Sequence, residues 1–280
     1  MTSQAPIRTR SWLFTPATRP ERFAKASQAG ADVAILDLED AVAPGDKARA
    51  RTTALDYLTK NPSDGALHAL RVNGLDTRAG ISDLDALLGS TAAPDFLVLP
   101  KTETAGHIEI LDRLLTAAGK ATRLIGLIES AHGLAAVEAI ATATPRLAGL
   151  MLGAADMAAD LGTTVAWEPL AFVRCRLIAA CALAGVVSVD SPYFDLHDEP
   201  GLKREVIGAV TFGFSAKAAI HPAQIGAINA ALTPSAEAVK RARAILAENT
   251  KGVGTVDGQM IDEAVARKAR RTLFSAGLEA

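Results

Sequence analysis

Acidic residues stand at the ends of three hydrophobic stretches, where a strand buried in a core would have no reason to carry them. Glu129 follows LIGLI, Asp156 follows LAGLMLGAA, and Asp37, Glu39 and Asp40 end the stretch VAILDLED. Carboxylates that converge without cysteine or paired histidine favour a hard cation such as Mg²⁺, which leaves positions for water and substrate oxygens. The pattern predicts a Mg²⁺ site at Glu129 and Asp156, although either acid could instead cap the helix after its strand.

A basic residue at the end of another apolar stretch suits the capture of a substrate carboxylate. Arg71 lies in LHALRVN, and a guanidinium can form two parallel hydrogen bonds with a carboxylate. The alternative is a structural ion pair with Glu39 or Asp40. Both roles are compatible, because Glu39 could orient Arg71 from behind. Asp37 lies two residues before Glu39, so their side chains are predicted to share one face of the strand.

Further basic residues follow the first apolar stretch. Arg19, Arg22 and Lys25 are spaced three apart around a predicted helix start. This spacing suits phosphate capture at a helix N-terminus, but it is equally typical of a solvated basic face. No GxSxG motif is present, so serine hydrolase chemistry has no basis in the sequence.

These residues need a scaffold that brings the ends of several strands together. Eight apolar stretches, each typical of a strand covered on both faces, alternate with helical patterns; they span residues 11–17, 33–40, 67–73, 96–101, 123–130, 147–154, 186–192 and 215–221. Eight such units without a GxGxxG turn predict an α/β fold, a (β/α)₈ TIM barrel, rather than an open doubly wound sheet. We expect a catalytic barrel over residues 8–232 and a C-terminal helical extension or lid over residues 233–280.

Composition narrows the possible partners of the chain. Its 280 residues carry a formal net charge of −2 and include two cysteines, Cys175 and Cys181. This charge gives no electrostatic reason to expect a nucleic acid or membrane partner. The sequence begins without an apolar signal core and contains no run long enough for a membrane helix. We therefore expect a cytoplasmic protein with reduced cysteines.

Six motifs in order give the chain a family resemblance. They read RSWLFTPATRPERF, LRVNG, LVLPKTE, LIGLIES, LMLGAADMAADLG and AKAAIHPAQI. In order and spacing the chain resembles the citrate lyase β-subunit (CitE-like) family of the HpcH/HpaI aldolase superfamily. The resemblance implies a Mg²⁺-dependent carbon–carbon lyase that cleaves citryl-, malyl- or citramalyl-CoA to acetyl-CoA and a 2-oxo acid. It also implies a homotrimer or a dimer of trimers.

The resemblance assigns roles to residues at the strand ends. Glu129 and Asp156 match the metal ligands, and Glu129 also faces the substrate. Arg71 matches the arginine that binds the substrate carboxylate. Glu39 and Asp40 match an acidic pair that supports catalysis.

Three residues farther along the mouth and the tail complete the predicted site. Arg19 and Lys217 match positions on the coenzyme A side. Asp262 matches an aspartate that reaches a neighbouring subunit, and it is our candidate for acid–base catalysis; the alternative is a plain helix N-cap. Alternative functions are a malyl- or citramalyl-CoA thioesterase, a CoA-independent 2-oxo-acid aldolase and a non-catalytic subunit of a larger assembly.

Overall fold

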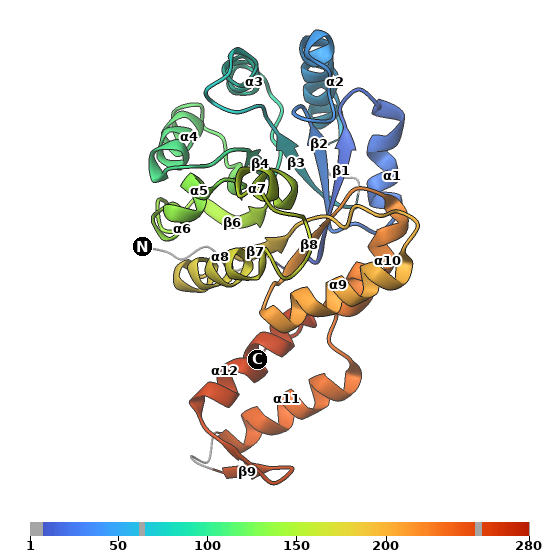
Figure 1. Ribbon diagram of the computed structural model, residues 1–280, viewed down its shortest axis with the longest axis vertical. Helices are drawn as coiled ribbons and strands as arrows, with labels where there is room; N and C mark the ends of the chain where they lie inside the picture. The colour runs from blue at the N-terminus through green and yellow to red at the C-terminus, as the bar shows by residue number, and fades with distance from the viewer. Residues whose placement is uncertain (1–7, 62–64, 250–253, 280) are drawn as a thin grey trace. The chain divides into compact units, whose positions relative to one another are not determined.

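A closed barrel of eight parallel strands forms the centre of the first part of the chain. The computed structural model describes residues 8–61, 65–249 and 254–279. The strands pair in chain order, and β1 closes the barrel against β8 (Figure 1). They are β1 (Ser11–Pro16), β2 (Val33–Asp37), β3 (Leu67–Arg71), β4 (Phe96–Leu99), β5 (Arg123–Ile128), β6 (Leu147–Leu152), β7 (Val187–Asp190) and β8 (Ala216–Ala219). The predicted (β/α)₈ barrel is confirmed.

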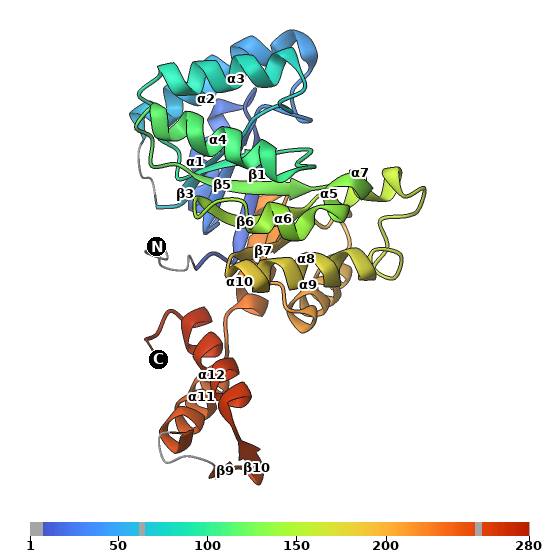
Figure 2. The same cartoon turned by 90° about the vertical axis from the view of Figure 1, so that its left-hand side faces the viewer.

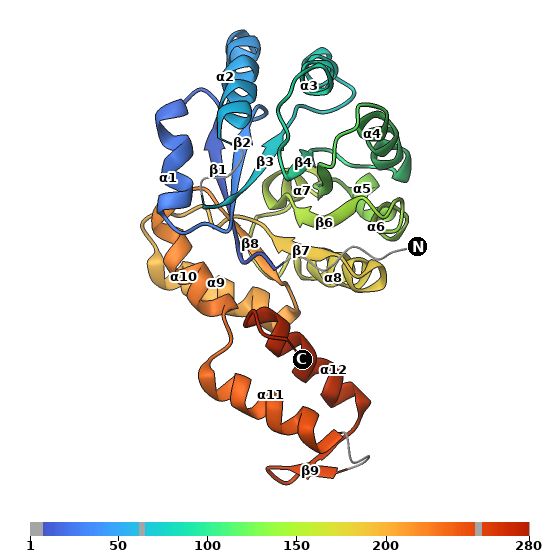
Figure 3. The ribbon, with the colours of Figure 1, turned by 180° about the vertical axis from the view of Figure 1, so that it is seen from behind.

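Helices follow the strands and lie on the outside of the barrel, as the views from two further sides show (Figures 2 and 3). They are α1 (Phe23–Gln28), α2 (Lys47–Lys60), α3 (Arg78–Gly89), α4 (Ala105–Ala117), α5 (Ala131–Ala135), α6 (Val137–Ala141), α7 (Ala154–Asp160), α8 (Ala171–Ala184), α9 (Glu199–Phe212) and α10 (Ile225–Leu232). Within the described ranges, no helix is both long and apolar enough to cross a bilayer.

Local sequence signals fix where several of these helices begin and end. The Thr77 side chain accepts a hydrogen bond from the Gly80 N–H at the start of α3, and Ser130 does the same for α5. Such caps satisfy main-chain donors that have no partner in the first turn. Helix α8 ends at Ala184 and is followed by Gly185, whose φ of 68° lies in the left-handed region that glycine adopts without strain.

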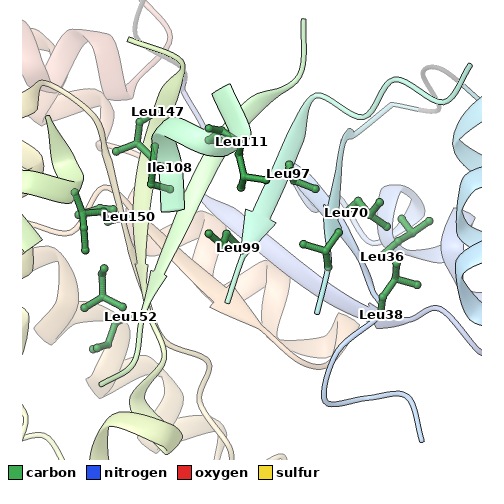
Figure 4. Close-up of a cluster of buried hydrophobic side chains, with 14 of the residues drawn as sticks. Leu36, Leu38, Leu70, Leu97, Leu99, Ile108, Leu111, Leu147, Leu150 and Leu152 are labelled. Atoms are coloured by element: carbon green, nitrogen blue, oxygen red, sulfur yellow. The ribbon is translucent and has the colours of Figure 1, made fainter. Parts of the chain in front are cut away.

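The strands are apolar on both faces because they separate two cores. Side chains such as Val33, Ile35 and Val98 fill the barrel interior. Their neighbours along the strands, which include Leu36 and Leu97, pack outward against the helices (Figure 4). Successive strand residues point to opposite faces, so burial on both sides produces the continuous apolar stretches of the sequence.

The C-terminal part of the chain packs as a separate unit. The contacts divide the chain into Met1–Ile228 and Asn229–Ala280, a division that falls within α10. The predicted boundary, after residue 232, lies four residues later, at the end of this helix. In the second unit, helices α11 (Ala236–Asn249) and α12 (Glu263–Ser275) lie side by side, and between them in sequence β9 (Gly254–Val256) pairs antiparallel with β10 (Gln259–Ile261). This unit has its own small apolar core, formed by Ala242, Ile245, Ile261, Ala269 and Leu273.

Candidate active site

A cavity of about 390 Å³ lies among the residues at and just beyond the carboxyl ends of the strands, where (β/α)₈ barrels place their binding sites. Its charged lining consists of Asp37, Asp40, Arg71, Glu129 and Asp156. Its apolar lining includes Phe14, Leu127, Met151, Pro192, Phe194 and Ile220. The structure thus brings both predicted metal ligands into one cavity with the arginine predicted to bind a carboxylate.

The two predicted metal ligands differ in their surroundings. Glu129 directly follows β5 and is only 4% exposed, whereas Asp156 lies exposed in the first turn of α7. Glu129 Oε1 accepts a hydrogen bond of 2.7 Å from the Lys101 main-chain N–H. Burial raises the pKa of Glu129 to about 8, and the charges of Glu39 and Asp156 act in the same direction. A buried carboxylate of this kind needs positive charge nearby to stay ionised.

Gly153 brings the main chain between β6 and α7 close to Glu129. A Cβ atom at this position would overlap Glu129 Oε2 and would lie 2.6 Å from Glu129 Cβ. Only glycine permits such a close approach of the backbone. The Glu129 carboxylate is therefore confined by Gly153 as well as by the Lys101 N–H. Sequence reasoning missed Gly153, because a glycine after a strand is typical of any turn.

Arg71, the last residue of β3, is held from several sides. Its Nε and Nη2 donate to Asp37 Oδ1 and Oδ2, both at 2.7 Å. Its Nη1 lies 2.7 Å from Glu39 Oε2 and 3.5 Å from Asp40 Oδ2. The guanidinium carbon lies 4.8 Å from the centre of the Phe14 ring. Asp37, rather than the expected Glu39 or Asp40, is the main partner, and it fixes the direction in which Arg71 enters the cavity.

Lys101 connects two acids of the predicted site, Glu39 and Glu129, and the predicted site did not include Lys101 itself. It lies just beyond β4 with φ of 49°, a left-handed conformation that is uncommon for a residue with a side chain. Besides its main-chain bond to Glu129, its Nζ donates to Glu39 Oε1 at 2.7 Å. Burial opposes its charge, yet the hydrogen bond and charge of Glu39 raise the pKa of Lys101. The available signal was its position at the end of the stretch LVLPK.

Lys217 lies away from the cavity. Its neighbours in β8, Ala216 and Ala218, face the barrel interior, so Lys217 points outward toward the helices and is completely buried. Its Nζ donates to Asp190 Oδ2, the Ser191 carbonyl and Glu205 Oε1 at 2.7, 2.7 and 2.8 Å. An ammonium has three donors, and all three are used. This geometry is that of a structural residue and differs from the substrate contact that we expected.

A second cavity, of about 200 Å³, lies next to the first and shares Phe14, Pro16 and Ile220 with it. Its basic lining comes from Arg22, Lys25 and His221. Arg19, the predicted anion-binding residue, is exposed and lines neither cavity. Of the three basic residues predicted to bind phosphate at this helix start, Arg22 and Lys25 therefore line the second cavity and Arg19 does not.

Asp262 belongs to the second unit of the chain. It is the N-cap residue of α12, and its Oδ1 accepts a hydrogen bond of 2.9 Å from the Val265 N–H. This is the alternative role that the sequence allowed. The side chain is exposed, so capping leaves its second oxygen accessible, and the role in proton transfer stays a prediction.

The donor set fits Mg²⁺. Two carboxylates, Glu129 and Asp156, line the cavity, and no group of three or more acidic, histidine or cysteine side chains that could hold a metal occurs among the residues described. Mg²⁺ binds through one or two carboxylates and keeps water or substrate oxygens as its other ligands. A bound cation would also supply the positive charge that the buried Glu129 requires.

Fold and site together define an α/β-barrel enzyme of the kind that binds a divalent cation at the mouth of the barrel. The chain belongs to the HpcH/HpaI aldolase/citrate lyase family, whose model matches residues 10–222. It is 36% identical to the L-malyl-CoA/β-methylmalyl-CoA lyase of Rhodobacter capsulatus over 95% of this chain and 94% of that protein.

Solved structures extend the comparison to three dimensions. RipC from Yersinia pestis is 57% identical and superposes with a TM-score of 0.74, covering 82% of this chain and 97% of that one. CitE from Mycobacterium tuberculosis, solved in complex with magnesium, acetoacetate and coenzyme A, is 35% identical with a TM-score of 0.80, and the match covers 96% of this chain and 98% of that one. The predicted family is therefore confirmed.

Proposed function

We propose that this protein is a magnesium-dependent carbon–carbon lyase that cleaves a 3-hydroxyacyl-CoA thioester of the malyl-, citramalyl- or citryl-CoA type to acetyl-CoA and a 2-oxo acid. The observation that carries the proposal is one cavity that contains the acid pair Glu129 and Asp156 together with Arg71. The relative from Rhodobacter capsulatus is named as a lyase of malyl-CoA thioesters, and the CitE structure holds magnesium and coenzyme A.

The two neighbouring cavities suit the two ends of such a substrate. Arg71 would bind the carboxylate at the acyl end through the donors that Asp37 leaves free. Arg22 and Lys25 line the second cavity, where their positive charges would attract the phosphates of coenzyme A. A CoA-independent aldolase would have no use for this basic second cavity.

The chemistry needs a base, a charge stabiliser and a proton donor. When bound by Glu129 and Asp156, Mg²⁺ supplies positive charge that favours the developing 2-oxo group. A base takes the proton of the 3-hydroxyl group, and the electrons of the cleaved carbon–carbon bond pass to the thioester enolate. Protonation of the enolate carbon then gives acetyl-CoA. Throughout, Arg71 would keep the carboxylate in one orientation, which lowers the entropic part of the activation free energy.

We assign the acid–base role to Asp262 as part of this proposal, and Asp40 is the competing candidate. Asp262 has an exposed carboxylate, and the family resemblance places its counterpart at a neighbouring subunit's mouth. Asp40 lines the cavity and its side chain is 62% exposed. Glu39 is paired with Arg71 and Lys101, so its proposed role is to position Arg71. The variants Asp262→Asn and Asp40→Asn separate the two candidates by their kcat.

The direct test is to incubate the purified protein and Mg²⁺ with malyl-, citramalyl- and citryl-CoA separately, and to measure the 2-oxo acid, acetyl-CoA and free CoA. We expect equal amounts of a 2-oxo acid and acetyl-CoA from at least one thioester. Release of free CoA with an intact hydroxy acid would instead identify a thioesterase. No turnover of any of the three would contradict the proposal.

The metal assignment has its own test. We expect Glu129→Gln and Asp156→Asn each to lower kcat at least 100-fold, since each removes a charged ligand of the cation. Asp56→Asn is the matched control, because Asp56 is an exposed acid on α2. Wild-type rates in both ligand variants, with Mg²⁺ chelated, would show that the assignment is wrong.

The homotrimer or dimer of trimers and the cytoplasmic location stay part of the proposal. They rest on the family resemblance, in which a neighbouring subunit contributes the aspartate that matches Asp262. Sedimentation velocity of the purified protein tests the assembly: a monomer that retains full activity would contradict it.

A further inference from the structure

Glu39 stands between two cations, and it bonds to them unequally. Its Oε1 accepts a hydrogen bond of 2.7 Å from Lys101 Nζ. Its buried Oε2 lies 2.7 Å from Arg71 Nη1 but makes no hydrogen bond with suitable geometry. Lys101 therefore provides the well-formed bond to this carboxylate, while Arg71 contributes charge alone. Any loss of Lys101 would leave a buried acid next to Arg71 with only that guanidinium as a partner.

Lys101 contacts a second acid, Glu129, through its main chain. The left-handed φ of 49° accompanies the placement of its N–H at 2.7 Å from Glu129 Oε1. The next residue, Thr102, is buried, and its N–H and hydroxyl bond to the carbonyls of Leu127 and Leu99. The chain at Lys101 is thus held firmly by the residue that follows it. Uncommon backbone conformations that persist in this way are concentrated at functional sites.

We propose that Lys101 is a positioning residue that controls how Arg71 binds the substrate carboxylate. Its ammonium holds Glu39 and so keeps that acid from forming full hydrogen bonds with Arg71. Its main-chain N–H independently orients Glu129 for the cation. The inference rests on the proposed function for the identity of the substrate, but the two roles belong to different parts of one residue and can be separated by substitution.

The charges determine the direction of each effect. In Lys101→Met, Glu39 would pair more completely with Arg71, and the guanidinium would then bind a carboxylate ligand more weakly. The same change removes a positive charge that interacts with Glu129, so affinity for a divalent cation should stay the same or increase. A purely structural role would instead weaken the binding of both ligands together.

The experiment measures both ligands without requiring turnover. Mn²⁺ affinity is measured by electron paramagnetic resonance, and pyruvate, a small 2-oxo acid, is titrated calorimetrically into the Mg²⁺-loaded protein. For Lys101→Met we expect at least a tenfold weaker pyruvate Kd and a Mn²⁺ Kd no weaker than twice the wild-type value. Lys101→Arg should keep the pyruvate Kd within threefold. Lys203→Met, which removes an exposed lysine paired with Glu199 on α9, is the matched control.

A second pair of variants tests the backbone role. Lys101→Gly favours the left-handed conformation and keeps the N–H toward Glu129, so its Mn²⁺ Kd should stay within twofold of wild type. Lys101→Val opposes that conformation because valine is β-branched. It should weaken Mn²⁺ binding at least fivefold. Circular dichroism and thermal midpoints establish that each variant is folded.

The outcomes distinguish this inference from the proposed function. An unchanged pyruvate Kd in Lys101→Met, or pyruvate and Mn²⁺ affinities that fall by similar factors, would overturn the role of the ammonium. Equal Mn²⁺ affinities in the glycine and valine variants would overturn the role of the backbone. If the wild type binds pyruvate but cleaves none of the three thioesters, the proposed function fails, and the pyruvate and Mn²⁺ affinities of the variants still decide the role of Lys101. If it also binds no pyruvate, both ideas fail.

Where turnover is found, the kinetics give an independent check. Weaker carboxylate binding in both the ground state and the transition state raises KM and leaves kcat almost unchanged. We expect Lys101→Met to raise KM for the CoA thioester about tenfold with kcat within threefold of wild type. A fall in kcat without a change in KM would contradict the proposal that Lys101 controls how Arg71 binds the carboxylate.

Discussion

Replacing Gly153 with alanine is expected to weaken Mg²⁺ binding, although Gly153 is not a predicted metal ligand. The effect would act through Glu129. The new methyl group would overlap Glu129 Oε2 and lie 2.6 Å from Glu129 Cβ. The φ of −94° and ψ of 81° at Gly153 do not demand glycine, so the conflict is one of space alone. Since the second contact is to Cβ, near the main chain, rotation of the carboxylate cannot relieve it.

The expected loss of Mg²⁺ affinity follows from the hydrogen bond that Glu129 would lose. Displacement would break or lengthen its 2.7 Å hydrogen bond with the Lys101 N–H. Loss of groups that orient a metal ligand typically lowers metal affinity by about 10- to 100-fold, equivalent to roughly 1.4–2.8 kcal/mol. Forcing an extra methyl group into a packed site should lower the free energy of unfolding by about 1–3 kcal/mol.

Titration with Mn²⁺, followed by electron paramagnetic resonance, measures the affinity, and urea unfolding measures the stability. Gly89→Ala is the matched control, because a Cβ at Gly89, at the end of α3, would meet no atom within 4 Å. Its Mn²⁺ affinity should equal that of the wild type. A Gly153→Ala protein that is folded and binds Mn²⁺ within twofold of wild type would show that close packing against Glu129 does not shape the site.

Two substitutions, a labelling experiment and a pH dependence probe other parts of the molecule. Arg71→Lys should lower kcat/KM roughly 10- to 100-fold, because an ammonium cannot reproduce the paired hydrogen bonds of a guanidinium; steady-state kinetics measure this. Lys217→Met should lower the free energy of unfolding by about 3 kcal/mol, because it leaves the buried charge of Asp190 with fewer partners; urea unfolding tests it. Iodoacetamide at pH 8 should label the exposed Cys175 but not the buried Cys181, as mass spectrometry would show. Burial raises the pKa of Cys181 to about 12 from 9.0, so unfolded chains lose this proton first and stability should fall as pH rises between those values.

The sequence predicted the barrel because strands buried on both faces leave a strong signal. Each stretch, such as LAGLMLGA, is apolar at successive positions, and the structure explains this by the two cores on either side of the strand wall. The acids at the strand ends were equally visible. Glu129, Asp156 and Arg71 line one cavity, because parallel strands bring their carboxyl ends to the same rim.

Lys217 illustrates what the sequence could not settle. In a strand that is buried on both faces, alternation gives no sign of which residues face inward. Ala216 and Ala218 fill the barrel interior, so the lysine between them points to the helices and pairs with Asp190. A shift of one residue in the orientation of the strand would have placed it inside instead.

Lys101 and Gly153 were missed for a different reason. Their importance depends on backbone geometry: a left-handed φ of 49° at Lys101 and a close approach to Glu129 at Gly153. Neither feature has a characteristic side-chain pattern. The main partner of Arg71 was missed similarly, since Asp37 and Glu39 both contact the guanidinium. The sequence spacing predicted that these acids lie together, but it could not show which of them is the main partner of Arg71.

The pairing of the first strand with the last has consequences for how the chain is made. Ser11 of β1 pairs with Lys217 of β8, so β1 is synthesised long before its second neighbour exists. Until β8 leaves the ribosome, β1 and β7 both carry unpaired edges, and such edges readily recruit strands from other chains. Closure across this sequence distance is also slow. A nascent or truncated chain that ends before Ala216 should therefore aggregate and depend on chaperones, whereas the closed barrel should not.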